Sequence, residues 1–476
     1  MLITIDREIF LSGMALSNYY DNATLSNRWN WMAYPNYNAN PGYSPDSLGI
    51  ETNYGGADLG LLQTGRVPVE YSNYLQNAIA ASCYFTTYYY SVDYASHIYK
   101  TDNSSHIHTV QDTMSKSTGD YSDIIVYQGK LFVTSNTDIY YTDLAFATKN
   151  NTWWTVTQGK TALQTSMSDG SGRGLTHFMF EFNGILYIVD GNMIHTWDGT
   201  TATYAYLTLP NNYLITDIEI DNNMIYLAIN VNNIYSKILV WDSITKTTWN
   251  SEYVVYAPNI SAIVKAEQGF ILFANNDLYY FDGNSYQWIR YIGATPSRNM
   301  VECLGGNIYF VNSNGIGCYN IRIKSLTQPI YYQYGSAISC LNISILGSID
   351  FFAQPFIGNG YTNTKFYTCY GLGACNTFYS IFYDVLSANI RRIEVMFATP
   401  LNDNADYTLQ ILDINGTVLH TQEITKTAEG AIIKKNWRID KKVDVFRVAL
   451  SFNNSACNAI KHIKVFYDDS ERFDNK

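Results

Sequence analysis

Short apolar runs separated by tight turns fill residues 260–293 of the chain. The runs cover 260–267, 270–274, 278–281 and 286–292, and the turns between them are Gln268-Gly269, Asn275-Asn276 and Asp282-Gly283. Such dipeptides between apolar runs are the strongest short signal for β-hairpins. The pattern therefore predicts four antiparallel strands. A sheet of this size cannot bury both of its faces alone, so we expect neighbours of the same kind.

The third turn of this unit recurs along the chain as an Asp that follows an apolar run. The recurring residues are Asp102, Asp143, Asp198, Asp242 and Asp282, and Asn320 takes the equivalent place. They are separated by 41, 55, 44, 40 and 38 residues. An Asp at a turn accepts hydrogen bonds from its own backbone two residues on, so we assign these residues a structural role in the turns. Four strands repeated at a period near forty predict the blades of a β-propeller.

The repeats divide the chain into three parts and predict an all-β protein. Residues 76–335 hold about six four-stranded blades, with five or seven left open because such a ring is usually closed by a strand from the other end. From residue 336 the period is lost and the strands lengthen, which predicts a β-sandwich of jelly-roll size over 336–476. Residues 1–75 are turn-rich with little periodicity and are predicted to form an extended N-terminal arm.

Several aromatic residues are candidates for subunit interfaces. Trp29, Trp31 and Tyr34 make the arm too apolar for a disordered tail, so we expect it to lie against its own propeller or a neighbouring subunit. Trp153 and Trp154 are adjacent on a predicted strand, where side chains alternate between faces. One of them is then exposed or covered by a partner, either an interface or a glycan. Three other tryptophans at strand ends beside turns are expected to pack between blades: Trp197, Trp241 and Trp288.

The composition argues against several classes of function. The formal net charge is −11, only 15% of residues are charged, and Lys and Arg are scattered until the pairs near Lys434 and Lys441, which is unlike a nucleic-acid-binding surface. The seven Cys lack CxxC spacing and are predicted to be free thiols in a reducing cytoplasm. Neither a secretory signal nor an apolar run of about 18 residues is recognisable, so we expect no membrane insertion.

The sequence offers no catalytic constellation. The turns TWDGT and FDGN lack the leading Ser of a sialidase Asp box, and Arg is sparse in the ring. Two acidic pairs have the residue types for acid and base work, Glu181 with Asp190 and Glu219 with Asp221, but nothing brings either pair together across the ring. His106 and His108 share one strand face without a third ligand. We predict no catalytic residues, no cofactor and no metal.

The order of an extended arm, a propeller and a sandwich resembles structural proteins of tailed bacteriophages. The stretches that carry this resemblance are NGILYIVDGNMIHTWDG, NNDLYYFDGNSYQW and TFYSIFYDVLSANIRRIEVMFATPL. The resemblance is to propeller-bearing tail, neck or nozzle components, whose subunit rings form part of the DNA conduit or carry fibres. It covers most of the chain but is architectural, since no signature motif is present.

This resemblance implies a virion protein that is made in the host cytoplasm and is not an enzyme. Its partners would be copies of itself in a ring, other tail or neck proteins, and tail fibres, while DNA passes nearby during ejection without specific binding. Two alternatives stay open at this stage: a glycan-binding, adhesin-like tail protein that recognises a receptor, and, with less support, a glycoside hydrolase.

Overall fold

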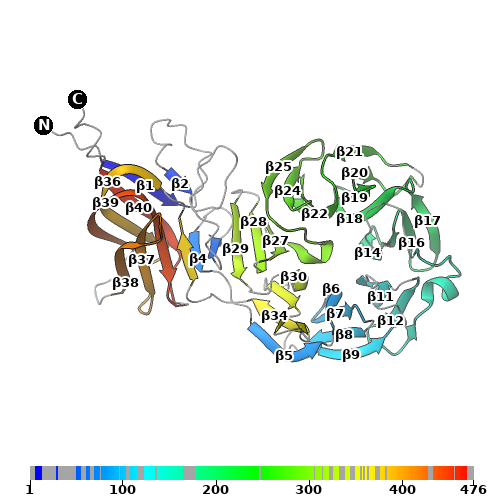
Figure 1. The fold of residues 1–476 in the computed structure, drawn as a ribbon. Helices are drawn as coiled ribbons and strands as arrows, with labels where there is room; N and C mark the ends of the chain where they lie inside the picture. Colours follow the sequence, from blue (N-terminus) through cyan, green and yellow to red (C-terminus); the bar gives the residue numbers. More distant parts are fainter. Residues whose placement is uncertain are drawn as a thin grey trace.

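The computed structural model of the chain is built almost entirely of β-strands (Figure 1). It describes residues 6–12, 28–30, 50–54, 61–64, 69–75 and, with short interruptions of which 165–176 is the longest, 77–468. In this part of the chain, four-stranded antiparallel sheets surround one axis, and a second domain lies beside the ring. The architecture is therefore a β-propeller followed by a second β-domain, as the repeats predict.

The first three blades are meanders of four consecutive strands. Blade 1 contains β6 (Ile79–Phe85), β7 (Tyr88–Asp93), β8 (His97–Asp102) and β9 (His108–Thr113). Blade 2 contains β10 (Ile124–Tyr127), β11 (Lys130–Thr134), β12 (Ile139–Asp143) and the short β13 (Lys149–Asn150), followed by a π-helical turn η3 (Trp153–Thr157). Blade 3 contains β14 (His177–Phe182), β15 (Ile185–Asp190), β16 (Met193–Trp197) and β17 (Ala202–Thr208).

The next three blades repeat the same order. Blade 4 contains β18 (Tyr213–Asp221), β19 (Met224–Val231), β20 (Tyr235–Trp241) and β21 (Ser251–Val255). Blade 5 contains β22 (Ile260–Ala266), β23 (Gly269–Ala274), β24 (Asp277–Phe281) and β25 (Tyr286–Tyr291). A 3₁₀ turn, η4 (Arg298–Met300), leads into blade 6, which contains β26 (Val301–Leu304), β27 (Asn307–Asn312), β28 (Gly315–Asn320) and β29 (Ser325–Tyr331).

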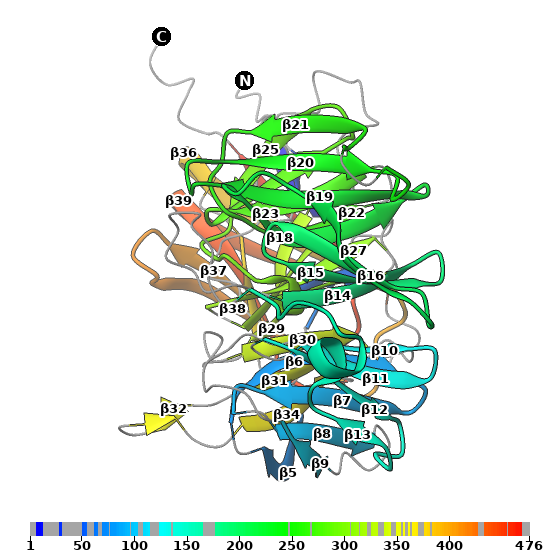
Figure 2. The same ribbon diagram turned by 90° about the vertical axis from the view of Figure 1, so that its right-hand side faces the viewer.

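The blades cover one another's faces, as a propeller requires. Inner strands of neighbouring blades contact one another around the axis, as β18 does with β22 and β6 does with β10 and β30. Figure 2 shows the ring from its edge, with the blades stacked on one another. Among the described residues, each junction between adjacent blades holds its own apolar cluster. The junction of blades 3 and 4, for example, buries Tyr187 and Trp241 edge to face, with ring centroids 5.9 Å apart. Burial of both sheet faces stabilises units that would be marginal alone.

The ring has a seventh blade, and the N-terminal part of the chain completes it. Its first three strands are β30 (Ile338–Ile343), β31 (Ile349–Ala353) and β34 (Thr364–Cys369), with a small hairpin, β32 (Phe356–Ile357) and β33 (Gly360–Tyr361), inserted before β34. The fourth strand is β5 (Val69–Leu75), which pairs antiparallel with β34. The ring therefore has seven blades, a count that the sequence left open beside the predicted six, and a strand from the other end of the chain closes it as expected.

The predicted domain boundaries at residues 75 and 335 are wrong for the same reason. The last blade has no third-to-fourth turn, because its fourth strand comes from the other end of the chain. The Asp or Asn that marks this turn elsewhere is consequently missing, and residues 338–369 looked like part of the sandwich. Residues 69–75 belong to the ring and not to an arm.

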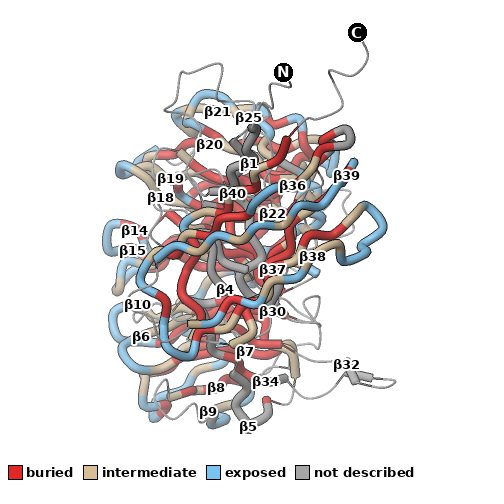
Figure 3. Tube along the Cα trace, turned by 90° about the vertical axis from the view of Figure 1, so that its left-hand side faces the viewer, coloured by how far each residue is buried: buried red, intermediate tan, exposed pale blue. Residues whose placement is uncertain are grey.

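The second domain is one sheet bent around a single apolar core. It contains β35 (Asn376–Tyr379), β36 (Tyr383–Phe397), β37 (Asp406–Asp413), β38 (Val418–Thr425), β39 (Lys434–Phe452) and β40 (Ile460–Asp468). The long β39 pairs with β36 through its first part and with β37 through its last part, so one strand runs through both layers. Both layers supply the core, which gives the sandwich-like arrangement seen in Figure 3.

Two segments of the predicted arm join this domain. β1 (Asp6–Ser12) pairs antiparallel with β40, and β2 (Arg28–Asn30) runs parallel to β1. β3 (Ile50–Tyr54) contacts β29 of blade 6, and its partner β4 (Leu61–Thr64) contacts β40. Strand pairing is thus continuous from blade 6 into the second domain. Each of the two outer links is a single residue pair, Gln328 with Ile50 and Leu62 with Ile460.

Closure by β5 makes a prediction about stability. Leu75 is fully buried in the cluster between blades 7 and 1. We expect Leu75→Ala to lower the free energy of unfolding by about 2–5 kcal/mol, because it leaves a cavity in this junction. Chemical denaturation of the full chain measures the change. Leu304→Ala is the matched control, since Leu304 is 41% exposed, and its cost should stay below about 1 kcal/mol. If Leu75→Ala lowered the free energy of unfolding as little as Leu304→Ala does, closure by β5 would be contradicted.

Candidate functional site

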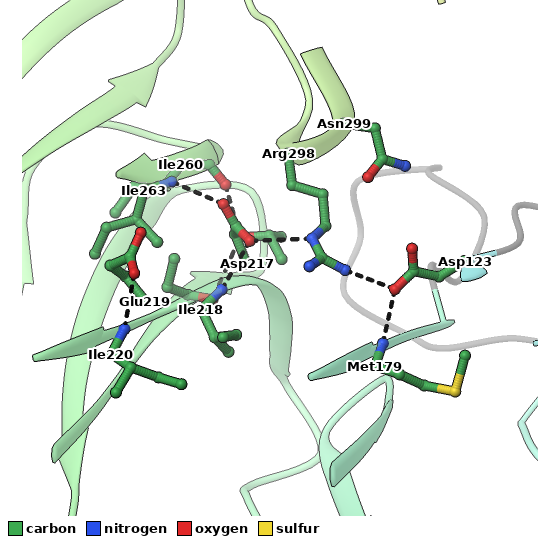
Figure 4. A network of polar contacts seen from close by, with 12 residues as sticks. Asp123, Met179, Asp217, Ile218, Glu219, Ile220, Ile260, Ile263, Arg298 and Asn299 are labelled. Carbon is green, nitrogen blue, oxygen red and sulfur yellow. Dashed lines mark hydrogen bonds and ion pairs between the residues drawn. The ribbon is translucent and has the colours of Figure 1, made fainter. Parts of the chain in front are cut away.

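Polar side chains at the inner strands of the ring form a network centred on Arg298 (Figure 4). The η4 turn that carries Arg298 lies between blades 5 and 6, and its side chain reaches across the ring. Arg298 Nη1 donates to Asp123 Oδ2 of blade 2 at 2.9 Å. Arg298 Nε lies 3.3 Å from Asp217 Oδ1 of blade 4. The guanidinium also stacks over the Phe178 ring of blade 3, with 4.3 Å between its central carbon and the ring centroid.

The residue next to Arg298 extends this bridge to blade 1. Asn299 Nδ2 donates to the carbonyl of Ala80 at 2.9 Å. One short turn therefore contacts blades 1, 2, 3 and 4 from its position between blades 5 and 6. Such a bridge resists opening of the ring at several junctions at once.

The acidic partners also join neighbouring blades directly. Asp123 accepts the backbone N–H of Met179 in blade 3 at 2.8 Å. Asp217 accepts the N–H of Ile263 in blade 5 at 2.9 Å, and Glu219 accepts that of Lys265 at 3.0 Å. Each carboxylate thus satisfies an amide of the adjacent inner strand. Charge-assisted hydrogen bonds of this kind are stronger than neutral ones.

Burial dominates the electrostatics of this network. It raises the pKa of Asp217 to about 7, although Arg298 and two backbone amides oppose the rise. Burial likewise raises the pKa of Glu302 to about 7, against the nearby Arg298. For Arg298, burial disfavours the cation, but Asp123 and Asp217 more than compensate and raise its pKa. The guanidinium therefore stays charged while two of its acidic neighbours titrate near neutrality.

A second polar cluster lies inside blade 3 and is closed to solvent. Asp190 Oδ2 lies 3.1 Å from His195 Nε2, and Asp190 Oδ1 lies 3.1 Å from His177 Nε2. Burial opposes the ionised form of Asp190, but the two histidines outweigh it and lower its pKa to about 2. His195 Nδ1 accepts the N–H of Ala205, which leaves its Nε2 as the donor to Asp190. Because Asp190 and His195 are fully buried, we assign this cluster to stability.

The five turn Asp residues all lie where the third strand of a blade ends. Asp143, Asp198, Asp242 and Asp282 each accept the backbone N–H two residues further on, at 2.8 to 3.1 Å. Hydrogen bonds from their own turns lower the pKa of all four carboxyls. Asp102 ends β8 in the corresponding position.

The predicted exposure of Trp153 or Trp154 is wrong. Both side chains are buried between blades 2 and 3, where Trp153 meets Trp197 edge to face at 5.1 Å and Trp154 stacks on His195 at 5.3 Å. Consecutive residues on a strand point to opposite faces, but these two lie on the π-helical turn η3, which turns both inward. They are therefore core residues and not an interface.

Other predicted residues fall into two groups. The structure describes the backbone of Trp29, which lies on β2, but not its side chain. The predicted interface residues Trp31 and Tyr34 lie outside the described residues. Trp241 packs between blades as predicted, whereas Trp288 is 48% exposed.

The acidic pairs considered for catalysis make structural contacts instead. Asp190 is enclosed by its histidines while Glu181 is exposed. Glu219 and Asp221 both bind Lys265, through its N–H and its Nζ respectively.

Sequence reasoning overlooked the role of Arg298. Its signal was the pair Asp217 and Glu219, which alternate with Ile218 and Ile220 in the innermost strand β18 and need a partner from elsewhere in the ring. Among the described residues, no cluster of three His, Cys, Asp or Glu side chains is arranged to hold a metal ion. Nor does this part of the chain contain a helix long and apolar enough to cross a bilayer.

No family model and no curated protein matches the sequence. Among solved structures, the chain is similar to the WD40 domain of Neurospora crassa Pan2, with 10% identity, a TM-score of 0.43, and coverage of 64% of this chain and 94% of that one. It is also similar to a chain of a mitotic checkpoint complex, with 10% identity, a TM-score of 0.45, and coverage of 71% and 98%. The chain is similar as well to the computationally designed protein Ika8, with 11% identity, a TM-score of 0.42, and coverage of 64% of this chain and 99% of that one. These values are too low to carry an argument, so the propeller assignment rests on the observed strand pairing.

The Arg298 bridge predicts a large cost for its removal. Arg298→Met would leave Asp123 and Asp217 buried beside no cation, so we expect the free energy of unfolding to fall by about 3–5 kcal/mol. Arg438→Met is the matched control, because the Arg438 side chain is 83% exposed, and its effect should stay within about 0.5 kcal/mol. Urea denaturation of both variants measures these free energies of unfolding and so shows whether the Arg298 contacts stabilise the ring. Similar small losses would show that Arg298 does not hold the ring.

The raised pKa of Asp217 predicts a pH dependence with a definite sign. A carboxyl whose pKa is higher in the folded state stabilises the fold below its unfolded value, near 4, and loses this contribution as the pH rises through 7. Asp217→Asn removes the titration. Between pH 5 and about 7, wild type should therefore lose stability relative to this variant by about 1.4 kcal/mol for each pH unit, and the loss should level off towards pH 8.

The control for this experiment is Asp282→Asn, because the pKa of Asp282 is lowered. Both its folded and unfolded values lie below pH 5, so its difference from wild type should stay constant between pH 5 and 8. Parallel stability curves for wild type and Asp217→Asn would contradict a raised pKa at Asp217.

Proposed function

We propose that this chain is a structural protein of a tailed-phage tail or neck, such as a nozzle component, which acts through subunit interfaces in a ring around or attached to the DNA conduit. The observation that carries the proposal is that the charged side chains at the propeller centre are bound to one another and to the backbone. A central channel is where a propeller brings together residues from all its blades. Here the Arg298 guanidinium pairs with Asp123 and Asp217. Both carboxylates also accept hydrogen bonds from backbone amides of neighbouring blades.

The connection between the domains also supports an assembly role. Blade 6 is linked to the second domain by strand pairing through β29, β3, β4 and β40. A continuous sheet holds the two domains in a fixed relation, which suits a subunit that must transmit position between neighbours. A flexible linker would be the default for independently acting domains.

The charge of the propeller suits a component that DNA passes without being held. Residues 69–382 contain 14 Lys and Arg against 22 Asp and Glu. The resulting negative potential repels phosphate groups and so disfavours non-specific DNA binding.

The proposal predicts a closed ring of identical subunits. Purified full-length chain should form a species of one defined multiple of 54.0 kDa in mass photometry, and particles with cyclic symmetry in electron micrographs. Closed cyclic symmetry is the usual outcome when one surface pair repeats. A strictly monomeric chain up to about 100 μM would contradict the proposal, because interfaces of standard size bind far more tightly than that.

A second candidate function is glycan binding at the outer edge of blades 4 and 5. Tyr256, Trp288 and Tyr291 are 83%, 48% and 64% exposed, respectively. Trp288 Nε1 donates to Asp277 Oδ1 at 3.0 Å, which fixes the indole in one orientation. A held aromatic ring flanked by a carboxylate offers a face for a sugar ring and acceptors for its hydroxyls.

Glycan binding is tested with the same protein. An oligosaccharide ligand found on a glycan array should lose at least about tenfold in affinity with Trp288→Ala, as expected for a central aromatic contact. The matched control is Ile244→Ala, since Ile244 is 77% exposed on the neighbouring blade 4. An array without any signal above background would remove this candidate.

A further inference from the structure

One edge of β40 is covered mainly by the first strand of the chain. β40 pairs along its other edge with β36, and β1 and β40 lie side by side in the second domain (Figure 1). All seven residues of β1 pair with β40, beginning with Asp6 opposite Asp468. β4 meets the same edge through one residue, Leu62. Among the described strands, β1 is therefore the principal partner of this edge.

The edge of β40 requires a strand partner. β40 itself is held in place by the core of the second domain, to which Ile463, Val465 and Tyr467 belong. Without β1, the backbone N–H and C=O groups along its free side would form an open sheet edge, which readily accepts a strand from another chain. Pairing of this kind gains affinity from main-chain hydrogen bonds, whichever copy supplies the strand.

The chain that follows β1 is long enough to reach another copy. β2 runs parallel to β1 and forms one unit with it. The next strand, β3, is held by β4 and by β29 of blade 6. Residues 31–49 separate β2 from β3. Nineteen residues span at most about 60 Å, which is about twice the diameter of a small domain. Chain length therefore does not confine β1 to the β40 of its own copy.

The sequence of residues 31–49 predicts an extended connection. It contains Pro35, Pro41 and Pro45. Proline restricts its own backbone and that of the preceding residue to conformations that disfavour a helix. The same stretch contains Trp31 and Tyr34, two of the predicted interface residues. A connection of this composition suits a segment that runs from one copy to the next.

We propose that β1 of one copy pairs with β40 of the next copy, so that exchanged strands hold the ring together. This inference rests on the proposed ring and specifies its interface. Exchange of an identical element keeps the contacts that the element makes within one chain, so it is a low-cost route to assembly. The contact joins a donated strand to an acceptor edge. Repeated head to tail, it closes a ring in which every β40 edge is paired.

The register favours β1 of an identical copy over an unrelated strand. Ile9 lies opposite Val465. Leu11 lies opposite Ile463, and both of these β40 residues are in the core. A shift of one residue would place polar positions of the donor opposite the core positions of β40. The acceptor edge is therefore matched to the sequence of β1.

The exchange leaves the propeller of each copy intact. β5, which completes blade 7, ends at Leu75, and β6 of blade 1 begins at Ile79. The three residues between them hold β5 beside its own ring. β3 likewise contacts β29 of blade 6. Only the segment before β3 is donated.

Disulfide trapping in the full chain distinguishes exchange from pairing within one chain. Phe10 and Lys464 lie directly opposite each other, and cysteines at opposed positions of antiparallel strands have the spacing that a disulfide needs. Chains with Phe10→Cys and chains with Lys464→Cys are co-expressed and then oxidised with oxidised glutathione. Exchange predicts a covalent dimer on a non-reducing gel. Pairing within one chain predicts no such dimer, because neither chain carries both cysteines.

The matched control replaces Lys464→Cys by Lys461→Cys. Lys461 is exposed on the same strand but lies three residues along it, about 10 Å away, which is too far for a disulfide with position 10. This control also measures cross-linking by native thiols, such as the exposed Cys303. We expect little dimer from it. Equal yields of dimer from the two pairs would overturn the exchange.

Two further measurements separate this interface from the proposed function. A chain without residues 1–30 cannot donate a strand and should form no rings in mass photometry. Full-size rings of this truncated chain, or rings of the cysteine variants without trapped dimer, would overturn the exchange and leave the proposed function standing. A wild-type chain that stays monomeric under all conditions would contradict both.

Discussion

Every blade of this propeller depends on a neighbour to cover each of its faces. A four-stranded sheet exposes two apolar surfaces, and the ring is the arrangement in which each surface meets another sheet. The last blade obtains its fourth strand from β5, so the ring closes only when the two ends of its sequence pair. Since β1, β3 and β4 precede β5 and pair with the second domain or blade 6, closure also fixes the sandwich to the ring.

The centre of the ring shows how polar groups serve the same closure. Arg298 contacts Asp123 and Asp217 from separate blades, and each of these carboxylates also accepts an amide of the next inner strand. Removing one member of such a set leaves a buried charge without its partner. The resulting loss of stability is far larger than the net stability that the intact set contributes to the fold. This interdependence explains why the acidic residues near the axis need no substrate or metal to account for them. It directs the search for function to the outer surfaces.

The sequence predicted what depends on local chemistry and missed what depends on pairing between distant segments. The repeated turns, such as those at Asp198 and Asp282, revealed the blades because Asp binds the amide two residues ahead. The sequence left a seventh blade open but did not locate it, because its fourth strand is about 290 residues from its third. Trp153 and Trp154 were misjudged because a π-helical turn replaces the expected strand. Arg298 was seen only as one of few arginines, since nothing local shows that it crosses the axis.

Hydrogen exchange of the full chain tests most directly whether β5 closes the ring. The account predicts that amides of β5 exchange as slowly as those of β34 and β31 and that all three respond alike to denaturant, as members of one cooperative unit. Exchange of β5 within seconds, while the six consecutive blades stay protected, would contradict the account. In that case the ring would be held together without the N-terminal strand, and the coupling between propeller and sandwich would lose its basis.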